Sequence, residues 1–167
     1  GIDSPKGLIG CNVGLNTFQT TLSVLAKGDL QSEYGVPWRD IHWYVAREET
    51  VSFTPPQEAK IQLMPKGKNI SEMLEQREID ALMMPHPPRH ALQGSKKIRR
   101  LFTDPKAEEL KYFRKNGFYP IMHIVAFKNE VLEKNAWAAL SVMQAFERAK
   151  EACNHYYDDP NWSRLAW

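Results

Sequence analysis

The sequence predicts one α/β domain over residues 1–167, with a mixed, mostly parallel sheet of about five strands and helices on both faces. Short apolar runs alternate with segments of helical periodicity, which is typical of βαβ units. The length suits a single domain with a real core. Hydrophobic residues make up 43% and charged residues 25%, and no apolar run approaches the about 18 residues of a spanning helix. This balance excludes a disordered chain and a membrane-spanning one.

The first βα unit begins with Leu8–Val13, a run apolar enough for a strand that is covered on both faces. A polar turn follows, in which Asn16 or Thr17 can cap a helix that ends at Gly35. Gln19 would complete a capping box with Asn16. Such a turn leaves backbone N–H groups free at the carboxyl end of a strand, which is a candidate anion site. An ordinary turn without a ligand is an equally weighted alternative, because no phosphate-loop motif is present.

The next elements continue the alternation. Asp40–Val45 is predicted as a second strand, parallel to the first by a right-handed crossover. Arg47–Lys60 is polar, contains consecutive prolines and is expected to be an irregular loop. Lys60–Met64 predicts a short third strand, and Asn69 with Glu72 forms a capping box that begins a short helix.

The second half of the chain carries three further signals. Ile79–Met84 predicts a buried strand, followed by His86–His90 as a rigid, proline-containing loop. Asp104 as cap and Pro105 as first residue begin a helix that should end near Asn116.

The strongest strand signal in the sequence is Tyr119–Phe127, whose near-continuous apolarity predicts a central place in the sheet. Asn135 should then cap a long amphipathic helix over residues 136–157. The tail, residues 158–167, carries two tryptophans that a lone domain would have to cover. We therefore expect the tail to pack on a partner.

The charge and the cysteine content limit the classes of function that the sequence supports. The net charge of +2 arises from 22 basic and 20 acidic residues that are interspersed, so no nucleic-acid surface is expected. Lys96–Arg100 is the densest basic cluster, and a solvated edge is favoured over a binding patch. Cys11 and Cys153 show no metal or redox spacing, and we expect no metal and no cofactor. The chain starts with Gly and has no signal peptide, which indicates a processed or excised piece and leaves the compartment open.

The candidate site lies where parallel strands end, because open α/β sheets bind ligands beyond the carboxyl ends of their strands. Helix-terminal N–H groups, aromatic walls and cations there suit a small aromatic or carboxylated ligand. The candidate ligand-binding residues are Asn16, Thr17, Phe18, Tyr44, Arg47, Arg89 and Tyr119. His86 and His123 are the candidate catalytic residues, since imidazoles titrate near neutrality. Tyr119 and His123 reach this edge only if their strand runs antiparallel, and His123 is otherwise a core histidine.

Blocks of sequence along the chain resemble the 4,5-dihydroxyphthalate decarboxylase family. They are Pro5–Gly10, Leu30–Val36, Arg77–Leu82, Pro87–Arg89, Ile98–Phe102, Gly117–His123, Ala136–Ala138 and Ala145–Lys150. That family is itself similar to the type II periplasmic solute-binding proteins, whose two lobes close on a ligand. The resemblance implies that this chain is one lobe, that the other lobe comes from residues before and after it, and that no cofactor is used. Arg77 stands where a Gly often precedes the Glu-Ile-Asp block.

The resemblance also implies a chemistry, in which an acid protonates the ring carbon that bears the departing carboxylate. His86 or His123 would be the acid, Arg89 would clamp the retained carboxylate, and the turn at Asn16 and Thr17 would hold a second anion. The alternatives are a non-catalytic solute-binding module of the ABC-transporter type and a ligand-free interaction domain. A decarboxylase would be cytoplasmic and a transport receptor periplasmic. The exposed side of a lone lobe predicts a homodimer, for which exchange of the C-terminal helix is one route.

Overall fold

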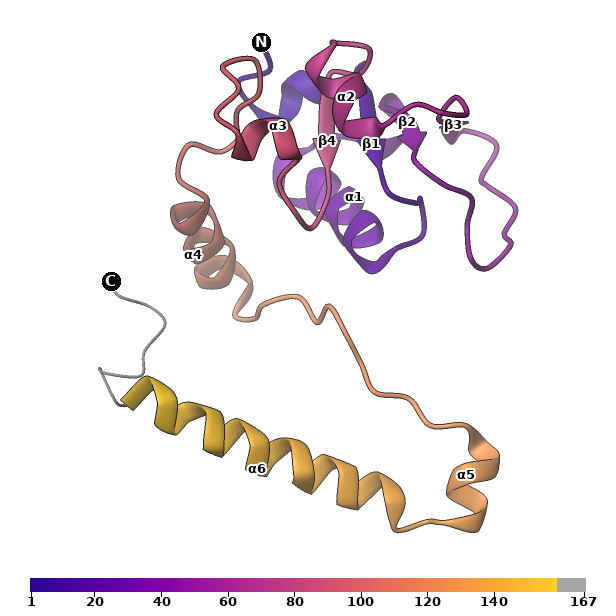
Figure 1. The fold of residues 1–167 in the computed structure, drawn as a ribbon, viewed down its shortest axis with the longest axis vertical. Coiled ribbons are helices and arrows are strands. Elements are labelled where there is room, and N and C mark those ends of the chain that lie inside the picture. The colour runs from indigo at the N-terminus through magenta and orange to yellow at the C-terminus, as the bar shows by residue number, and fades with distance from the viewer. Residues whose placement is uncertain (159–167) are drawn as a thin grey trace. The chain divides into compact units, whose positions relative to one another are not determined.

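The computed structural model describes residues 1–158 of the chain (Figure 1). The chain divides into two compact units, residues 1–123 and the residues from Ile124 on. The first unit holds the sheet and the helices around it, and the second, over its described residues 124–158, holds two helices. Within residues 1–158, no helix combines the length and the apolar character that crossing a membrane requires.

The sheet of the first unit consists of four parallel strands in the order β3-β2-β1-β4 (Figure 1). The strands are β1 Asn12–Leu15, β2 His42–Val45, β3 Lys60–Leu63 and β4 Ala81–Met83. In the register of the sheet, Val13 lies between Trp43 and Ala81. These four strands confirm the α/β class, but the sheet is parallel throughout rather than mixed. The first strand also begins later than the predicted Leu8–Val13, because Leu8 ends the 3-10 helix η1 Pro5–Leu8. Because all four are parallel, their carboxyl ends meet at one edge of the sheet.

The predicted fifth strand, Tyr119–Phe127, does not form, so that prediction was wrong. Residues 119–128 have no regular structure, and the side chains of Ile121 and Ile124 are 77% and 82% exposed. A strand is stable only when a neighbouring strand takes up its backbone hydrogen bonds. No strand in the described part of the chain does this for residues 119–128. The apolar pattern of residues 119–127 indicates that these side chains tend to be buried, but it does not identify a strand with which they could pair.

The helical elements are η1 Pro5–Leu8, α1 Thr21–Tyr34, η2 Trp38–Asp40, α2 Ile70–Glu75, α3 Arg89–Leu92, α4 Pro105–Asn116, α5 Asn129–Lys134 and α6 Ala138–Asp158. Helix α1 begins later than predicted. Its cap is Thr20, whose side chain accepts a hydrogen bond from the Ser23 N–H at 3.4 Å. Thr17 cannot be the cap because it is buried before the helix, where its carbonyl accepts from the Ser23 hydroxyl at 2.7 Å. Gly35 ends the helix with a φ of 65°, as predicted.

Two further helix starts confirm the capping signals. The Asn69 side chain accepts from the N–H groups of Ser71 at 2.8 Å and Glu72 at 3.3 Å, and α2 follows. The Asp104 carboxylate accepts from the Ala107 N–H at 3.0 Å at the start of α4.

Two other predicted boundaries were wrong. The segment His86–His90 is not wholly a loop, because α3 begins at Arg89, directly after Pro88. Asn135 does not cap the long helix from its side chain but ends the short helix α5. Its carbonyl accepts from the Ala138 N–H at 2.9 Å, where α6 starts. The predicted packing of the tail concerns residues 159–167, which lie outside the described residues.

The two faces of the sheet carry separate cores, which confirms helices on both faces. On one face, Val13, Leu15 and Trp43 pack with Leu30 of α1. On the other, the core consists of Ile70 and Met73 of α2 with Ile79 before β4. Gly14 faces this second core, and a Cβ atom there would lie 2.8 Å from Ile79 and Leu82 and 2.9 Å from Ile70. The glycine therefore lets α2 pack closely on β1.

Candidate functional site

The loops after β1 and β2 are joined by backbone hydrogen bonds at the carboxyl edge of the sheet. The Ala46 N–H donates to the carbonyls of Leu15 at 2.9 Å and Asn16 at 3.1 Å. The Arg47 N–H also donates to the Asn16 carbonyl, at 3.2 Å. The turn at Asn16 and the loop at Arg47, which the sequence placed at the same edge, therefore lie side by side.

A carboxylate already lies on the turn that precedes α1. The Phe18 N–H donates to Glu49 Oε1 at 2.5 Å, and the Gln19 N–H donates to Glu49 Oε2 at 3.3 Å. The N–H groups that hold a carboxylate are therefore those of Phe18 and Gln19, two residues after the predicted Asn16 and Thr17, and the carboxylate comes from the loop after β2. Sequence reasoning missed Glu49, because the loop over residues 47–60 has no pattern that aligns it with the turn. The available signal was an acid placed shortly after a strand that ends at the same edge.

Lys27 holds the other side of the same turn. Its side chain is 7% exposed, and Nζ donates to the Phe18 carbonyl at 2.8 Å and lies 2.9 Å from the centre of the Phe18 ring. Burial lowers the pKa of Lys27 to about 8, while the nearby Glu49 carboxylate raises it by a smaller amount. Both backbone polar groups of Phe18 are therefore fixed by charged side chains, one from α1 and one from the loop after β2.

Phe18 belongs to the core rather than to an open wall. It is 7% exposed, its ring stacks on Phe53 with the ring centres 6.0 Å apart, and it meets Trp38 and Trp43 edge-on at 6.1 and 6.4 Å. Phe53 comes from the loop after β2, as does Glu49. That loop therefore contacts the turn through an aromatic stack and a carboxylate.

The other predicted residues divide into buried and exposed groups. Thr17 is 3% exposed, and Tyr44 is half-buried against the core around α2. Arg47, His86 and Arg89 are exposed, and neither arginine makes an ion pair with another described residue. These three side chains lie after β2 and β4, at the carboxyl edge, and are available to a ligand.

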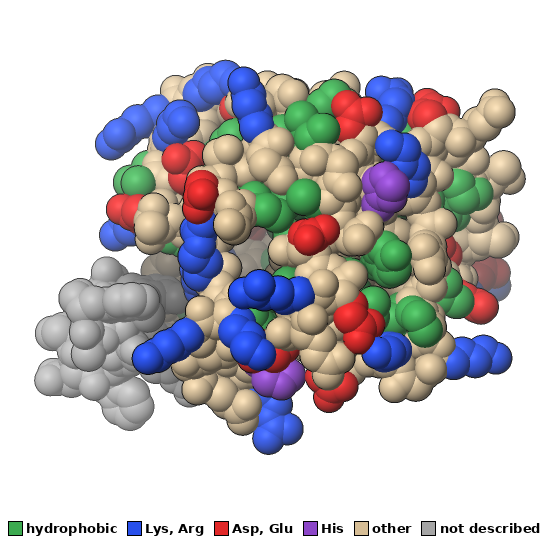
Figure 2. All heavy atoms as spheres, turned by 90° about the horizontal axis from the view of Figure 1, so that it is seen from above, with side chains coloured by type: hydrophobic (Ala, Val, Ile, Leu, Met, Phe, Trp, Pro, Cys, Tyr) green, Lys and Arg blue, Asp and Glu red, His purple; other side chains and the backbone are tan. Residues whose placement is uncertain are grey.

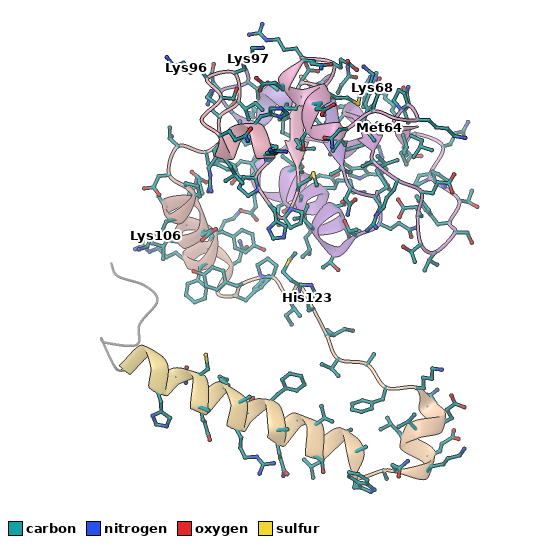
Figure 3. All side chains as sticks on the ribbon, viewed as in Figure 1. Met64, Lys68, Lys96, Lys97, Lys106 and His123 are labelled. Atoms are coloured by element: carbon teal, nitrogen blue, oxygen red, sulfur yellow. The ribbon has the colours of Figure 1, made fainter. Side chains whose placement is uncertain are left out.

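Tyr119 and His123 are placed differently. Tyr119 is 54% exposed and stacks on Phe113 of α4, with the ring centres 4.8 Å apart. His123 is exposed on the strandless segment that follows α4 (Figure 3). The structure does not bring these two residues to the carboxyl edge by the strand on which that prediction depended.

A groove of about 1000 Å³ runs along β4, an edge strand of the sheet. Its apolar lining includes Ile79, Leu82, Leu101 and Phe102, and its lining at the carboxyl end of β4 includes His86. Among the predicted site residues, His86 is the one in the lining of this groove.

Metal ligands do not gather in the described structure. Among residues 1–158, no three side chains of the metal-binding types lie together. Cys11 and Cys153 are free cysteines, and burial raises the pKa of the Cys11 thiol. Cys11 is half-buried, and its Sγ lies 3.1 Å from the Gly7 carbonyl oxygen.

Comparison with known proteins finds two similar proteins that carry the same name. The chain is 30% identical over 156 residues to a 4,5-dihydroxyphthalate decarboxylase of Comamonas testosteroni, covering 90% of this chain and 47% of that protein. The resemblance to this family is confirmed. A second 4,5-dihydroxyphthalate decarboxylase, from Pseudomonas putida, is 27% identical over 120 residues, which cover 68% of this chain and 46% of that protein. The chain spans about half the length of both decarboxylases. No family model matches the chain.

Proposed function

We propose that this chain binds a small carboxylated, aromatic molecule at the carboxyl edge of its sheet, as part of a decarboxylase-like protein. The observation that carries the proposal is the carboxylate of Glu49 on the N–H groups of Phe18 and Gln19. Two successive N–H groups that hold one carboxylate have the geometry to hold another. A ligand carboxylate would exchange with Glu49 at this turn.

The exposed cations of the same edge would hold the rest of the ligand. Arg47 lies next to the Asn16 carbonyl, and Arg89 begins α3 directly after the loop that follows β4. A guanidinium binds a carboxylate through two parallel hydrogen bonds, so either arginine suits the second carboxylate of a phthalate. Asn16, Thr17 and Tyr44 would shape the turn, as the sequence predicts, whereas Tyr119 stacks on Phe113 of α4 and has no part in this proposed site.

The similarity to the two decarboxylases supports a reaction as well as binding. In decarboxylation of a dihydroxyphthalate, a proton adds to the ring carbon that bears the carboxylate, assisted by the para hydroxyl. The bond to the carboxylate carbon then breaks, its electron pair returns to the ring, and carbon dioxide leaves. His86, which lines the groove beside β4, is the proposed acid. His123, the other candidate from the sequence, lies on the exposed segment after α4, and no strand of the described chain brings it to this edge. Arg89 would hold the carboxylate that remains.

A non-catalytic module of the type II solute-binding class would need the same carboxylate contacts but no acid. The His86→Asn variant separates the two functions. If the chain is an enzyme, this variant retains binding and loses formation of dihydroxybenzoate from 4,5-dihydroxyphthalate. If neither chain forms product while both bind, the solute-binding function is supported instead.

A homodimer is the proposed assembly. Large apolar side chains are exposed along α6, among them Leu140 at 55%, Met143 at 59% and Phe146 at 60%. They recur at helical spacing, and a continuous apolar stripe of this kind is normally covered by another surface. Exchange of α6 between two copies would cover it. Light scattering of the 19.3 kDa chain should give twice that mass, and a monomer at high concentration would contradict the proposal.

The experiment that tests ligand binding is thermal unfolding of the purified chain with phthalates, hydroxybenzoates and aliphatic carboxylates. A ligand that binds only the native state, present at 100 times its Kd, stabilises it by about 2.7 kcal/mol. We expect an aromatic dicarboxylate to raise the Tm and its diamide to leave the Tm unchanged. If no carboxylate raises the Tm, the interaction-domain alternative gains support.

A further inference from the structure

The groove along β4 gathers basic side chains from two distant parts of the sequence. Arg77 comes from the turn after α2, whereas Lys97, Arg99 and Arg100 come from the segment after α3. Sequence analysis favoured a solvated edge for the second group. The structure adds Arg77 to it and places both groups beside an apolar wall. Lys and Arg side chains also stand beside apolar ones on the face shown in Figure 2.

Two of these four cations are already paired. Lys97 Nζ lies 3.8 Å from Glu75, and Arg99 pairs with Asp3. Arg77 and Arg100 make no ion pair with any described residue. The acid that lines the groove, Asp80, accepts a hydrogen bond from the Asn12 N–H at 2.8 Å. The groove therefore has an excess of positive charge, with two guanidinium groups free to bind an anion.

Arg77 holds its place at a conformational cost. Its φ is 62°, and it is the one residue other than glycine with a positive φ in the described part of the chain. It closes the end of α2, where its N–H donates to the Leu74 carbonyl at 3.1 Å. Glycine is the favoured residue at such a helix end, because a side chain there is strained. A strained arginine whose side chain lines a cavity indicates that the side chain has a use.

We propose that this groove binds a soluble small molecule with an apolar body and an anionic group, either a carboxylate or a phosphate. Arg77 and Arg100 contact the anionic group, while Ile79, Leu82 and Phe102 contact the apolar body. The volume of about 1000 Å³ is at the upper end of the range for ligand sites. His86 lines the carboxyl end of the same groove, but the proposal needs neither His86, the turn at Phe18 nor Glu49, so its contacts are distinct from those of the carboxyl-edge site.

The test is calorimetric titration of the full chain with octanoate and with octyl phosphate, using octanol as the uncharged probe. We expect saturable binding of at least one anion and none of octanol. Arg77→Gly and Arg100→Gln should each weaken that binding about tenfold, the effect of losing one charge-assisted hydrogen bond. The matched control is Lys96→Gln, which removes a charge from the same loop (Figure 3) but not from the lining of the groove.

Arg77→Gly also separates ligand binding from a structural role. Because glycine relieves the positive φ, the variant should unfold at a higher temperature than the parent chain while binding octanoate more weakly. If Arg77 merely ends α2, octanoate affinity would not change. Equal affinity in the parent and both arginine variants, equal binding of octanol, or no binding of either anion would overturn the proposal.

Discussion

Replacing Glu49 by glutamine should strengthen the binding of carboxylate ligands at the carboxyl edge. In the structure, each carboxylate oxygen of Glu49 takes one N–H group, from Phe18 at 2.5 Å and from Gln19 at 3.3 Å. Glutamine offers a single neutral oxygen, so one of the two bonds is lost and the other is no longer charge-assisted. Any ligand that needs these N–H groups must displace residue 49, and a weaker internal competitor is displaced more easily.

The magnitude follows from the two hydrogen bonds. Bonds to a charged group contribute about 1 kcal/mol more than neutral ones, so the variant weakens the internal contact by about 1 to 2 kcal/mol. This free energy corresponds to a gain in ligand affinity of about 5- to 30-fold. The same change should lower the stability of the unliganded chain, because the turn loses a partner.

The assay is calorimetric titration with phthalate, together with thermal unfolding of each chain. Glu48→Gln is the matched control, since Glu48 is exposed, carries the same charge and is not the acid that accepts from the N–H groups of the turn. Glu49→Asp is the second variant: its shorter side chain keeps the charge but reaches the turn less well, so it should also bind phthalate more tightly. A Glu49→Gln chain that folds and binds phthalate no better than the control would refute the exchange of carboxylates.

Three further predictions concern stability. Gly14→Ala should cost about 1 to 3 kcal/mol in urea unfolding, because its Cβ would lie 2.8 Å from Ile79 and Leu82; an unchanged midpoint would show that α2 shifts freely. Burial lowers the pKa of Lys27 from 10.5 to about 8 in the folded chain. Between pH 8 and 10.5 the unfolded chain therefore binds more protons than the folded chain, and the free energy of unfolding should rise by about 3 kcal/mol across this range. Lys27→Met should remove this rise, and a slope equal to that of the parent would contradict the assignment. Asp104→Ala should cost about 1 kcal/mol by removing the cap of α4, whereas Asp104→Asn should cost less.

The sequence by itself determined the elements whose signals lie within a few residues. The caps at Asn69 and Asp104 and the stop at Gly35 depend on hydrogen bonds or dihedral angles local to one turn, so the residue types reveal them. The four strands of the sheet follow from short apolar runs, and the parallel pairing of the first two follows from the crossover that joins them. The carboxyl edge, and with it the neighbourhood of the candidate site, follows from that pairing.

Only the tertiary structure decided which distant groups meet. Residues 119–127 have the sequence of a strand, but strand formation requires a neighbour, and the described chain gives them none. Glu49 is 31 residues from Phe18, and Arg77 is separated from Arg100 by β4 and α3. Whether these residues meet depends on how the loops fold back on the sheet, and the periodicity of the side chains does not predict the course of a loop. The carboxylate on the turn and the basic groove could therefore be found only in three dimensions.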